Sequence, residues 1–425
     1  MASTTWKLEA LEAFTDGLNL RSDQFNLAGN ESPDLLNVLV DPRGGIRQRD
    51  GVDRRNLTAL SADIQGIWAL HTDSGTNQVM VNYSTKVAHS ATSNFTDLTG
   101  ITSRTDGSRV YGVTMNNVAY GVSYDQVCFR WNGTTAADLG VTFGSGGNMP
   151  QAQYIAAWNN FAWVAYTYES GTAHKYRLRW SNANDPETWT AADYVDIDKG
   201  DHGDYITGLC PMGDRLLVFK SNSVHAVFGF DSDSFQVVTL SNDVGSVPLS
   251  SPVTTPFGVF FWYADQGVYL YNRESFVWVF DKMSPAVDDG RISFTTNPQL
   301  GWGNNKLYVS VDWTEAGATT RRTLIYDPTI AGGAWVTTDI DAAAMYSYRP
   351  PNSSSTVYGA CVANTGVLID VEDEQNRSTD RYASSAETHI SSYFVTRWVS
   401  GKNPILKKRW GRPRLVTSAE ASIVL

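Results

Sequence analysis

The sequence predicts an all-β chain, built as a β-propeller of about seven blades with strand-containing arms at both ends. The 425 residues include 14 Trp, 20 Tyr and 35 Gly. Aromatic side chains favour strands, and glycine favours tight turns. A turn of small residues followed by an aromatic or aliphatic strand also recurs at intervals of 40 to 54 residues. This interval is typical of a four-stranded propeller blade.

The recurring unit is interpreted as a β-hairpin. Its copies start at residues 74, 114, 157, 211, 255, 301 and 352. Turns such as Asn116-Asn117 and Asn159-Asn160 suit the positive φ angles that close a two-residue hairpin. Segments 127–131, 176–180 and 323–326 follow as candidate third strands. We therefore expect the propeller to span residues 61–380; the alternative is a β-sandwich with accidental spacing.

The two ends of the chain are expected to be separate from the propeller. Residues 1–60 form an N-terminal arm, in which segments 37–41 and 46–49 flank a glycine-rich turn and predict a β-hairpin. Ser32 and Pro33 suit the first positions of a short helical turn. Residues 381–425 form a basic, strand-rich docking segment whose apolar end must pair with another strand.

Charge is distributed unevenly along the chain. The sequence has 33 basic and 44 acidic residues, a net charge of −11. Segment 401–414 is exclusively basic among its charged residues. These are Lys402, Lys407, Lys408, Arg409, Arg412 and Arg414. We expect them, together with Arg43, Arg47 and Arg49 of the N-terminal arm, to make assembly contacts with acidic partner surfaces. The acidic run 370–374 is either solvated or the partner of the basic segment in a neighbouring subunit.

Motifs that carry chemistry are weak or missing in this sequence. Asp196, Asp198 and Asp201 alternate along a glycine-bearing loop, which makes them weak candidates for a calcium site, although the spacing is not that of an EF-hand. Neither a zinc-binding histidine pair, a phosphate-binding loop nor a nucleophile elbow occurs. The three cysteines lie far apart and predict buried thiols. We therefore expect no enzymatic activity and no cofactor.

Several stretches resemble bacteriophage tail proteins of the tail nozzle (tail tubular protein B) type. The N-terminal ones are residues 17–23, 31–38 and 41–51, the last reading DPRGGIRQRDG. Residues 177–189, 206–220 and 407–414 are similar too. The resemblance implies a virion structural protein, made in the host bacterial cytoplasm and placed in the tail. It also implies a ring of six copies around the tail axis, in contact with other tail proteins.

This resemblance leads to a functional hypothesis. A nozzle, tail-tip ring or adaptor helps to form or close the DNA exit channel, and an acidic wall would repel the phosphates of DNA in transit. The alternatives are a tail propeller that binds host glycans through aromatic side chains, and a carbohydrate-active propeller enzyme with converging carboxylates. Because no run approaches about 18 apolar residues, we expect no membrane span.

Overall fold

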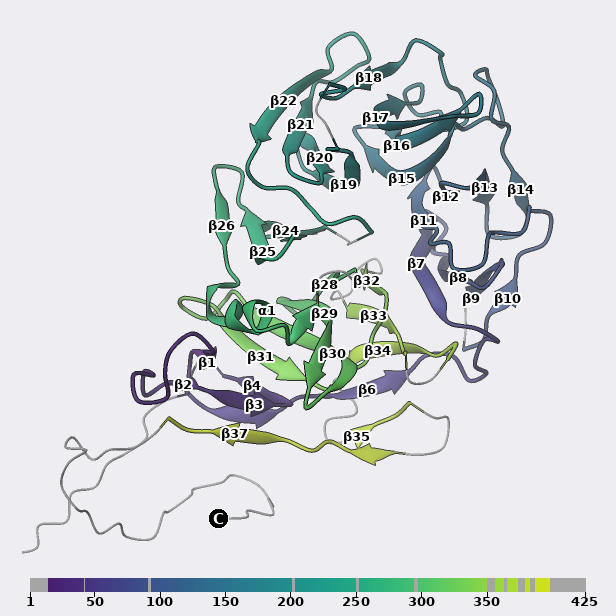
Figure 1. Cartoon of the computed structure of the whole chain (residues 1–425). Coiled ribbons are helices and arrows are strands. Elements are labelled where there is room, and N and C mark those ends of the chain that lie inside the picture. The colour runs from purple at the N-terminus through teal and green to yellow at the C-terminus, as the bar shows by residue number, and fades with distance from the viewer. Residues whose placement is uncertain are drawn as a thin grey trace, which may run out of the picture.

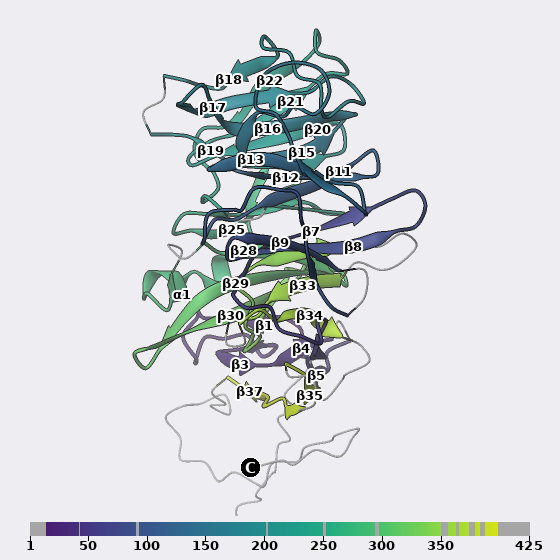
Figure 2. The same ribbon diagram turned by 90° about the vertical axis from the view of Figure 1, so that its right-hand side faces the viewer.

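The protein is a ring of β-sheets. The computed structural model describes residues 14–41, 43–90, 93–200, 203–249, 252–293, 297–349, 356–362, 365–373, 379–382 and 387–397. Seven sheets stand around a common axis, six of them with four strands and one with seven (Figure 1). The ring lies edge-on in the perpendicular view of Figure 2. The predicted all-β propeller with strand-containing arms is confirmed.

Five consecutive blades are antiparallel meanders in chain order. The first two consist of β7 (Ile64–His71), β8 (Asn77–Tyr83), β9 (Lys86–Ser90), β10 (Thr96–Asp97), and β11 (Tyr111–Met115), β12 (Val118–Ser123), β13 (Gln126–Trp131), β14 (Ala136–Asp138). The next three consist of β15 (Gln151–Trp158), β16 (Phe161–Glu169), β17 (Thr172–Trp180), β18 (Tyr194–Asp196); β19 (Ile206–Met212), β20 (Arg215–Lys220), β21 (Val224–Phe228), β22 (Gln236–Ser241); and β23 (Val253–Thr255), β24 (Gly258–Tyr263), β25 (Gly267–Tyr271), β26 (Phe276–Trp278).

The sixth and seventh blades include strands from the N-terminal part of the chain. The sixth is built on β28 (Gln299–Gly303), β29 (Lys306–Glu315), β30 (Ala318–Asp327) and β31 (Ala334–Thr338), and is widened by β27 (Ile292–Ser293), β1 (Gly17–Leu18) and β2 (Glu31–Ser32). The seventh consists of β32 (Met345–Tyr348), β33 (Thr356–Ala360), β34 (Leu368–Asp373) and β6 (Gly51–Arg54). Two short helices, η1 (Asp281–Met283) and α1 (Pro285–Asp288), precede the sixth blade.

Strand β6 closes the ring. It pairs antiparallel with β34, with Arg54 opposite Ile369 and Gly51 opposite Asp373. The seventh blade thus joins residues from both ends of the chain. The boundary expected at residue 60 therefore differs from the structure, because β6 belongs to a blade although it precedes that boundary.

The remaining six strands belong to no blade and form three separate two-stranded sheets beside blades 6 and 7. They are β3 (Asp34–Leu36), β4 (Val38–Val40), β5 (Ile46–Gln48), β35 (Thr379–Asp380), β36 (Thr388–His389) and β37 (Tyr393–Val395). Strands β4 and β5 form the predicted hairpin. The helical turn expected at Ser32 is wrong, because these residues are extended and the Ser32 hydroxyl bonds the carbonyl oxygens of Asp34 and Val395.

The recurring sequence unit is the hairpin between the first and second strands of each blade. Its Asn-Asn turns have the expected backbone: Asn116 and Asn117 have φ of 52° and 65°, and Asn159 and Asn160 have 51° and 65°. Positive φ at both central residues is the type I′ geometry that matches strand twist. The turn residues therefore determine where each hairpin lies, and the interval between hairpins is the length of one blade.

The first strand of each blade lines the axis, and these strands contact one another in a closed circle. Close approach there requires small residues. Gly112 on β11 faces Trp68 on β7, and any Cβ at position 112 would overlap the indole ring. Trp131 joins the first two blades farther out, since its Nε1 donates to Gln78 Oε1 at 2.7 Å.

We predict that Gly112→Ala lowers the free energy of unfolding by about 1–3 kcal/mol, because the added methyl overpacks the contact between β7 and β11. Chemical denaturation measures the change. Gly45→Ala is the matched control, since its Cβ would meet only Asp41 Cβ at 3.9 Å. The control should stay within about 0.5 kcal/mol of the parent; equal stability of both variants would contradict the close approach.

Candidate functional site

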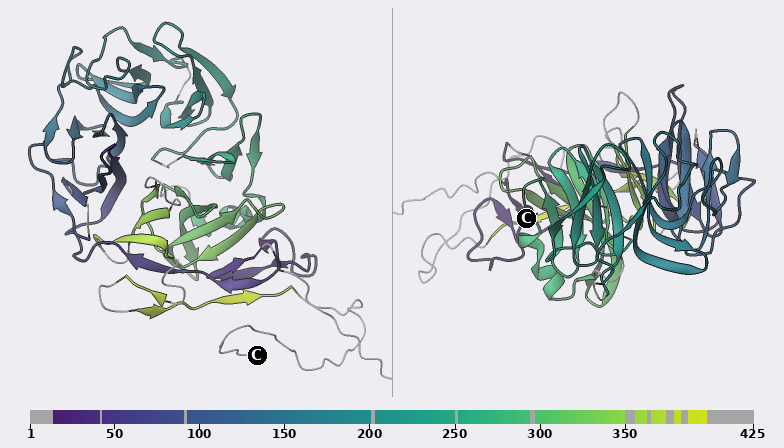
Figure 3. Two further views of the ribbon diagram at one scale, coloured as in Figure 1. Left: turned by 180° about the vertical axis from the view of Figure 1, so that it is seen from behind. Right: turned by 90° about the horizontal axis from the view of Figure 1, so that it is seen from above.

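The six strands that belong to no blade form a second layer beside blades 6 and 7. We call this layer the terminal platform (the described residues of 14–50 and 379–397, apart from β1 and β2, which extend the sheet of blade 6). Figure 3 shows this layer from behind, with the yellow C-terminal strands beside the purple N-terminal ones. Strand β3 pairs antiparallel with β37, placing Leu35 opposite Phe394. Ring centroids of Phe14 and Phe394 lie 4.6 Å apart. The platform therefore combines residues more than 350 positions apart in the sequence.

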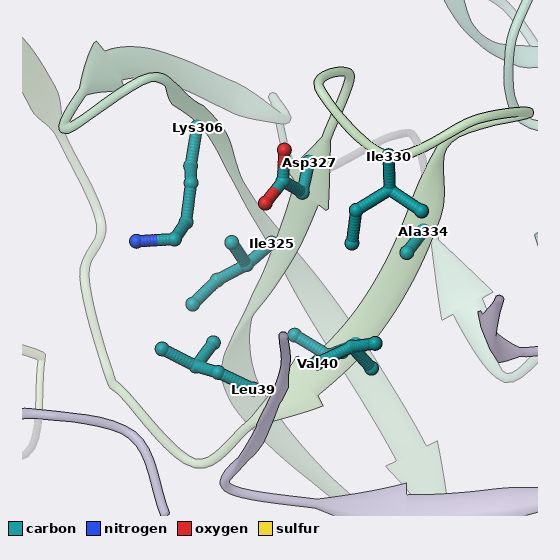
Figure 4. A pocket seen from close by; sticks show the side chains of 8 residues that line it. Leu39, Val40, Lys306, Ile325, Asp327, Ile330 and Ala334 are labelled. Atoms are coloured by element: carbon teal, nitrogen blue, oxygen red, sulfur yellow. The ribbon is translucent and has the colours of Figure 1, made fainter. Parts of the chain in front are cut away.

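Apolar packing holds the platform to blade 6. Leu39 and Val40 of β4 face Ile325 of β30 and Ile330, which are all buried (Figure 4). The space left between them is about 10 Å³, no more than one water molecule occupies. The platform is thus part of the folded body.

Arg49 joins the two halves of the platform. Its side chain is 1% exposed, and its Nη1 and Nη2 donate to the Asp380 carboxylate at 2.7 and 2.5 Å. Nη2 also reaches Asp339 Oδ1 at 2.9 Å, and Nε donates to Asn37 Oδ1 at 2.8 Å. The expectation that Arg49 contacts another subunit is therefore corrected: the guanidinium is buried and occupied within its own chain.

The other predicted assembly residues have different placements. Arg43 and Arg47 are exposed, and Arg47 forms a bidentate pair with Asp50 at 2.8 and 3.0 Å. The six basic residues of segment 402–414 lie outside the described residues. The chain leaves the described structure at Arg397, two residues beyond β37. In the sequence, the basic segment begins five residues after Arg397.

The platform exposes apolar side chains of strands at its edge. Ile46 of β5 is 40% exposed, Tyr393 and Val395 of β37 are 43% and 39% exposed, and Phe25 is 62% exposed. Within the described part of the chain, β37 pairs only with β3, so its other edge carries no strand. Open edges with apolar side chains are typical surfaces for strand pairing with another chain.

We predict that Arg49→Met lowers the free energy of unfolding by about 3–5 kcal/mol, because Asp380 keeps its buried charge and loses its partner. Urea denaturation measures the loss. Lys86→Met, which breaks an exposed pair with Asp97 at 2.6 Å, should cost less than about 1 kcal/mol. Similar losses for the two variants would show that Arg49 is not the anchor of the platform.

The axis of the propeller holds a second candidate site, a cavity of about 320 Å³ between the first strands. Arg109 lies on its wall with its guanidinium 4.9 Å from the Tyr111 ring, and its Nη1 donates to Leu249 O at 3.0 Å. Burial raises the pKa of the lining thiol of Cys210 to about 12, so it is protonated at neutral pH. The described lining residues include no carboxylate, although the carbohydrate-active alternative expects a converging pair there. Sequence reasoning overlooked Arg109, which belongs to no motif.

A cluster of tyrosine rings is the feature that the glycan-binding alternative would use. The rings of Tyr124, Tyr166 and Tyr205 come from three consecutive blades, with centroids 5.2 and 6.0 Å apart in edge-to-face contacts. Tyr166 has φ of 57° at a bulge in β16, which turns its side chain towards this cluster. Because the rings pack on one another, part of their surface is covered within the molecule and cannot contact a glycan.

The acidic loop is engaged by basic side chains of its own chain. Asp196 accepts from Arg177 Nε and Nη2 at 2.7 and 3.0 Å, which lowers the pKa of its carboxyl. Asp198 Oδ2 lies 3.4 Å from His225 Nε2. Asp201 lies outside the described residues, and those that are described contain no group of three metal-ligating side chains. The ion pair of Asp196 thus stabilises blade 3, and Asp198 places the loop beside the imidazole of blade 4.

The acidic run 370–374 is also engaged internally. Glu372 is 7% exposed, accepts from the Tyr308 hydroxyl and pairs with Lys306 Nζ at 3.1 Å. Asp370 Oδ1 accepts from the Thr356 hydroxyl at 2.5 Å. Glu372 thus joins blades 6 and 7 and is neither solvated nor available to the basic segment, whereas Glu374 lies outside the described residues.

His225 lies in a buried polar chain next to this loop. Its side chain is 1% exposed, its Nε2 lies 3.0 Å from Ser223 Oγ, and Ser223 Oγ donates to Asp204 Oδ2 at 2.6 Å. Lys220 Nζ lies 3.4 Å from the same oxygen. Burial lowers the pKa of His225, against the opposing pull of the Asp198 carboxylate. The imidazole is therefore held in its neutral form.

We predict that the protein loses stability as the pH falls below about 6.5, the ordinary histidine pKa, because the unfolded chain then binds a proton that the buried imidazole of His225 resists. This contribution is complete above that pH and declines below it. Urea denaturation at pH 7.5 and 5.5 should show a smaller acid loss in His225→Gln than in the parent. The exposed His389→Gln is the control, and an unchanged acid loss in His225→Gln would contradict the assignment.

Comparison with known proteins gives a fold likeness alone. No family model and no curated protein matches the sequence. Among solved structures, YCF48 bound to a D1 peptide is 9% identical with a TM-score of 0.47, over 80% of this chain and 100% of that one. BBS1N in complex with ARL6DN is 9% identical with a TM-score of 0.46, over 78% and 98%. Raptor of Chaetomium thermophilum is 9% identical with a TM-score of 0.49, over 77% and 30%. These similarities are too low to bear on function.

The described helices are also too short to cross a bilayer: neither η1 nor α1 has the length or apolar composition of a membrane span.

Proposed function

We propose that this protein is a non-enzymatic structural component of a bacteriophage tail that assembles into a ring through its terminal platform. The observation that carries the proposal is the platform itself. Segments from both ends of the chain meet on one side of the propeller, expose apolar strand residues there and lead into the basic segment 402–414. The resemblance of the termini to tail nozzle proteins supports the same function.

The propeller is proposed as the rigid body of each subunit, with the DNA channel between subunits. The cavity of about 320 Å³ at the propeller axis lies within one subunit, whereas the resemblance implies a channel at the axis of a ring of subunits. A channel for DNA therefore requires several copies around the tail axis, six according to the resemblance. The net charge of −11 suits a wall that does not retain phosphates.

We predict that a chain lacking residues 401–425 folds but is not incorporated into particles, because the basic segment is the extension that reaches neighbouring proteins. Complementation of a phage deprived of its own copy, followed by immunoblotting of purified particles, measures incorporation. Circular dichroism should retain the β-sheet spectrum of the full chain.

A full-length chain with a short peptide tag after Leu425 is the control, because it alters the same end without removing the basic residues. Normal incorporation of the truncated chain would contradict a docking function of this segment. Loss of β-sheet structure would instead mean that the segment is needed for folding.

A further inference from the structure

The outer edge of blades 4 and 5 has a concentration of acidic side chains, which we call the acidic rim. It consists of the outermost strands β22 and β26 and the turns beside them; both strands lie on the perimeter of the ring (Figures 1 and 3). Its exposed carboxylates are those of Asp231, Asp233, Asp243, Asp265 and Glu274. They lie at both ends of the two strands. Arg273, next to Glu274, is exposed too and lies 3.9 Å from Asp214, so the five carboxylates leave this edge with a net negative charge.

These five carboxylates differ from other acids of the same blades. None of them lies within ion-pair distance of a basic side chain in the described part of the chain. By contrast, Asp214 pairs with Arg215 at 3.0 Å, and Asp204 pairs with Lys220 at 3.4 Å. Like charges left unpaired on one edge repel one another, and a cationic partner would relieve that repulsion.

Apolar side chains are exposed between the carboxylates. Val238 of β22 is 44% exposed, Val277 and Trp278 of β26 are each 40% exposed, and Phe230, next to Asp231, is 86% exposed. Both strands end their sheets, so their outer edges carry no described strand. The rim therefore offers negative charge, apolar area and open backbone groups, a combination that suits an extended basic segment with apolar residues.

We propose that the acidic rim binds the basic segment 402–414 of a neighbouring copy of this chain. The segment reads KNPILKKRWGRPR, with six basic residues, no acid, and the apolar residues Ile405, Leu406 and Trp410. Its basic and apolar side chains complement the negative charge and the apolar area of the rim. The other acidic candidate, Glu372, is buried and paired with Lys306.

This pairing determines the type of assembly. The donor segment follows from the platform on blades 6 and 7, whereas the acceptor is on blades 4 and 5, so the two surfaces of one copy are different. Contacts between different surfaces of identical subunits run head to tail and produce a ring when the rotation closes. The inference rests on the proposed function and assigns its subunit contact to particular residues.

Cross-linking between distinguishable copies tests the proposal. Equal amounts of unlabelled and ¹⁵N-labelled full-length protein are mixed at high concentration and treated with a carbodiimide, which joins an amine directly to a carboxylate. Mass spectrometry should find Lys402, Lys407 or Lys408 joined to rim carboxylates in mixed light–heavy pairs. Exclusively same-isotope pairs would overturn the proposal, because the segment would then fold back onto its own rim. Absence of rim cross-links would overturn it as well.

Charge reversal provides an independent test. Asp233→Lys with Glu274→Lys should raise the dissociation constant for self-association about tenfold in analytical ultracentrifugation, because two attractions become repulsions. The control variant, Asp63→Lys with Asp106→Lys, changes the net charge by the same amount at exposed sites away from the rim. It should leave the dissociation constant unchanged. Lys407→Glu with Lys408→Glu in the partner copy should restore association with the rim variant.

The outcomes separate this inference from the proposed function. Rings that form without rim cross-links, or that are equally weakened by both pairs of reversals, would overturn the docking of 402–414 on the rim and leave the tail function standing. A protein that neither self-associates nor enters particles would overturn the proposed function itself.

Discussion

The fold depends on the closure of its ring, where residues 51–54 from one end of the chain pair with residues 368–373 from the other. A propeller buries each sheet against its two neighbours, so a missing outer strand would expose the seventh blade to solvent and to foreign strands. Arg49 secures this closure, because its bonds to Asp380 and Asp339 fix both chain ends beside β6. Buried charge is tolerated there because every partner is satisfied from within the molecule.

Closure also determines where the functional surface lies. Both ends of the chain are brought to blades 6 and 7, and the strands left over form the terminal platform against the sheet of blade 6. The rigid propeller can then hold a donor end and an acceptor edge at fixed positions, which lowers the entropy lost on association. The internal pairing of Asp196, Glu372 and Arg49 contrasts with the unpaired carboxylates of the rim. Internal ion pairs stabilise the blades, whereas the free charges remain available to partners.

Much of the fold was predictable because local signals carry it. The Asn-Asn turns specify hairpins through φ, and their regular interval specifies blades. The ring closure was not predictable, since pairing of β6 with β34 depends on contacts between residues more than 300 positions apart. The same limit explains why the burial of Arg49 was not predicted. Its neighbours in the sequence are polar, as on an exposed strand, and its partners Asp380 and Asp339 lie about 300 residues away. Arg47, two residues away, has its partner Asp50 nearby and stays at the surface.

The central claim is that copies of this chain join head to tail through their chain ends and the edge of blades 4 and 5. Cryo-electron microscopy of particles carrying the protein tests it most directly. The account predicts a closed ring in which density continuing from Arg397 of each copy crosses to strands β22 and β26 of the next. Solitary copies, or a ring whose contacts leave that edge facing solvent, would contradict it.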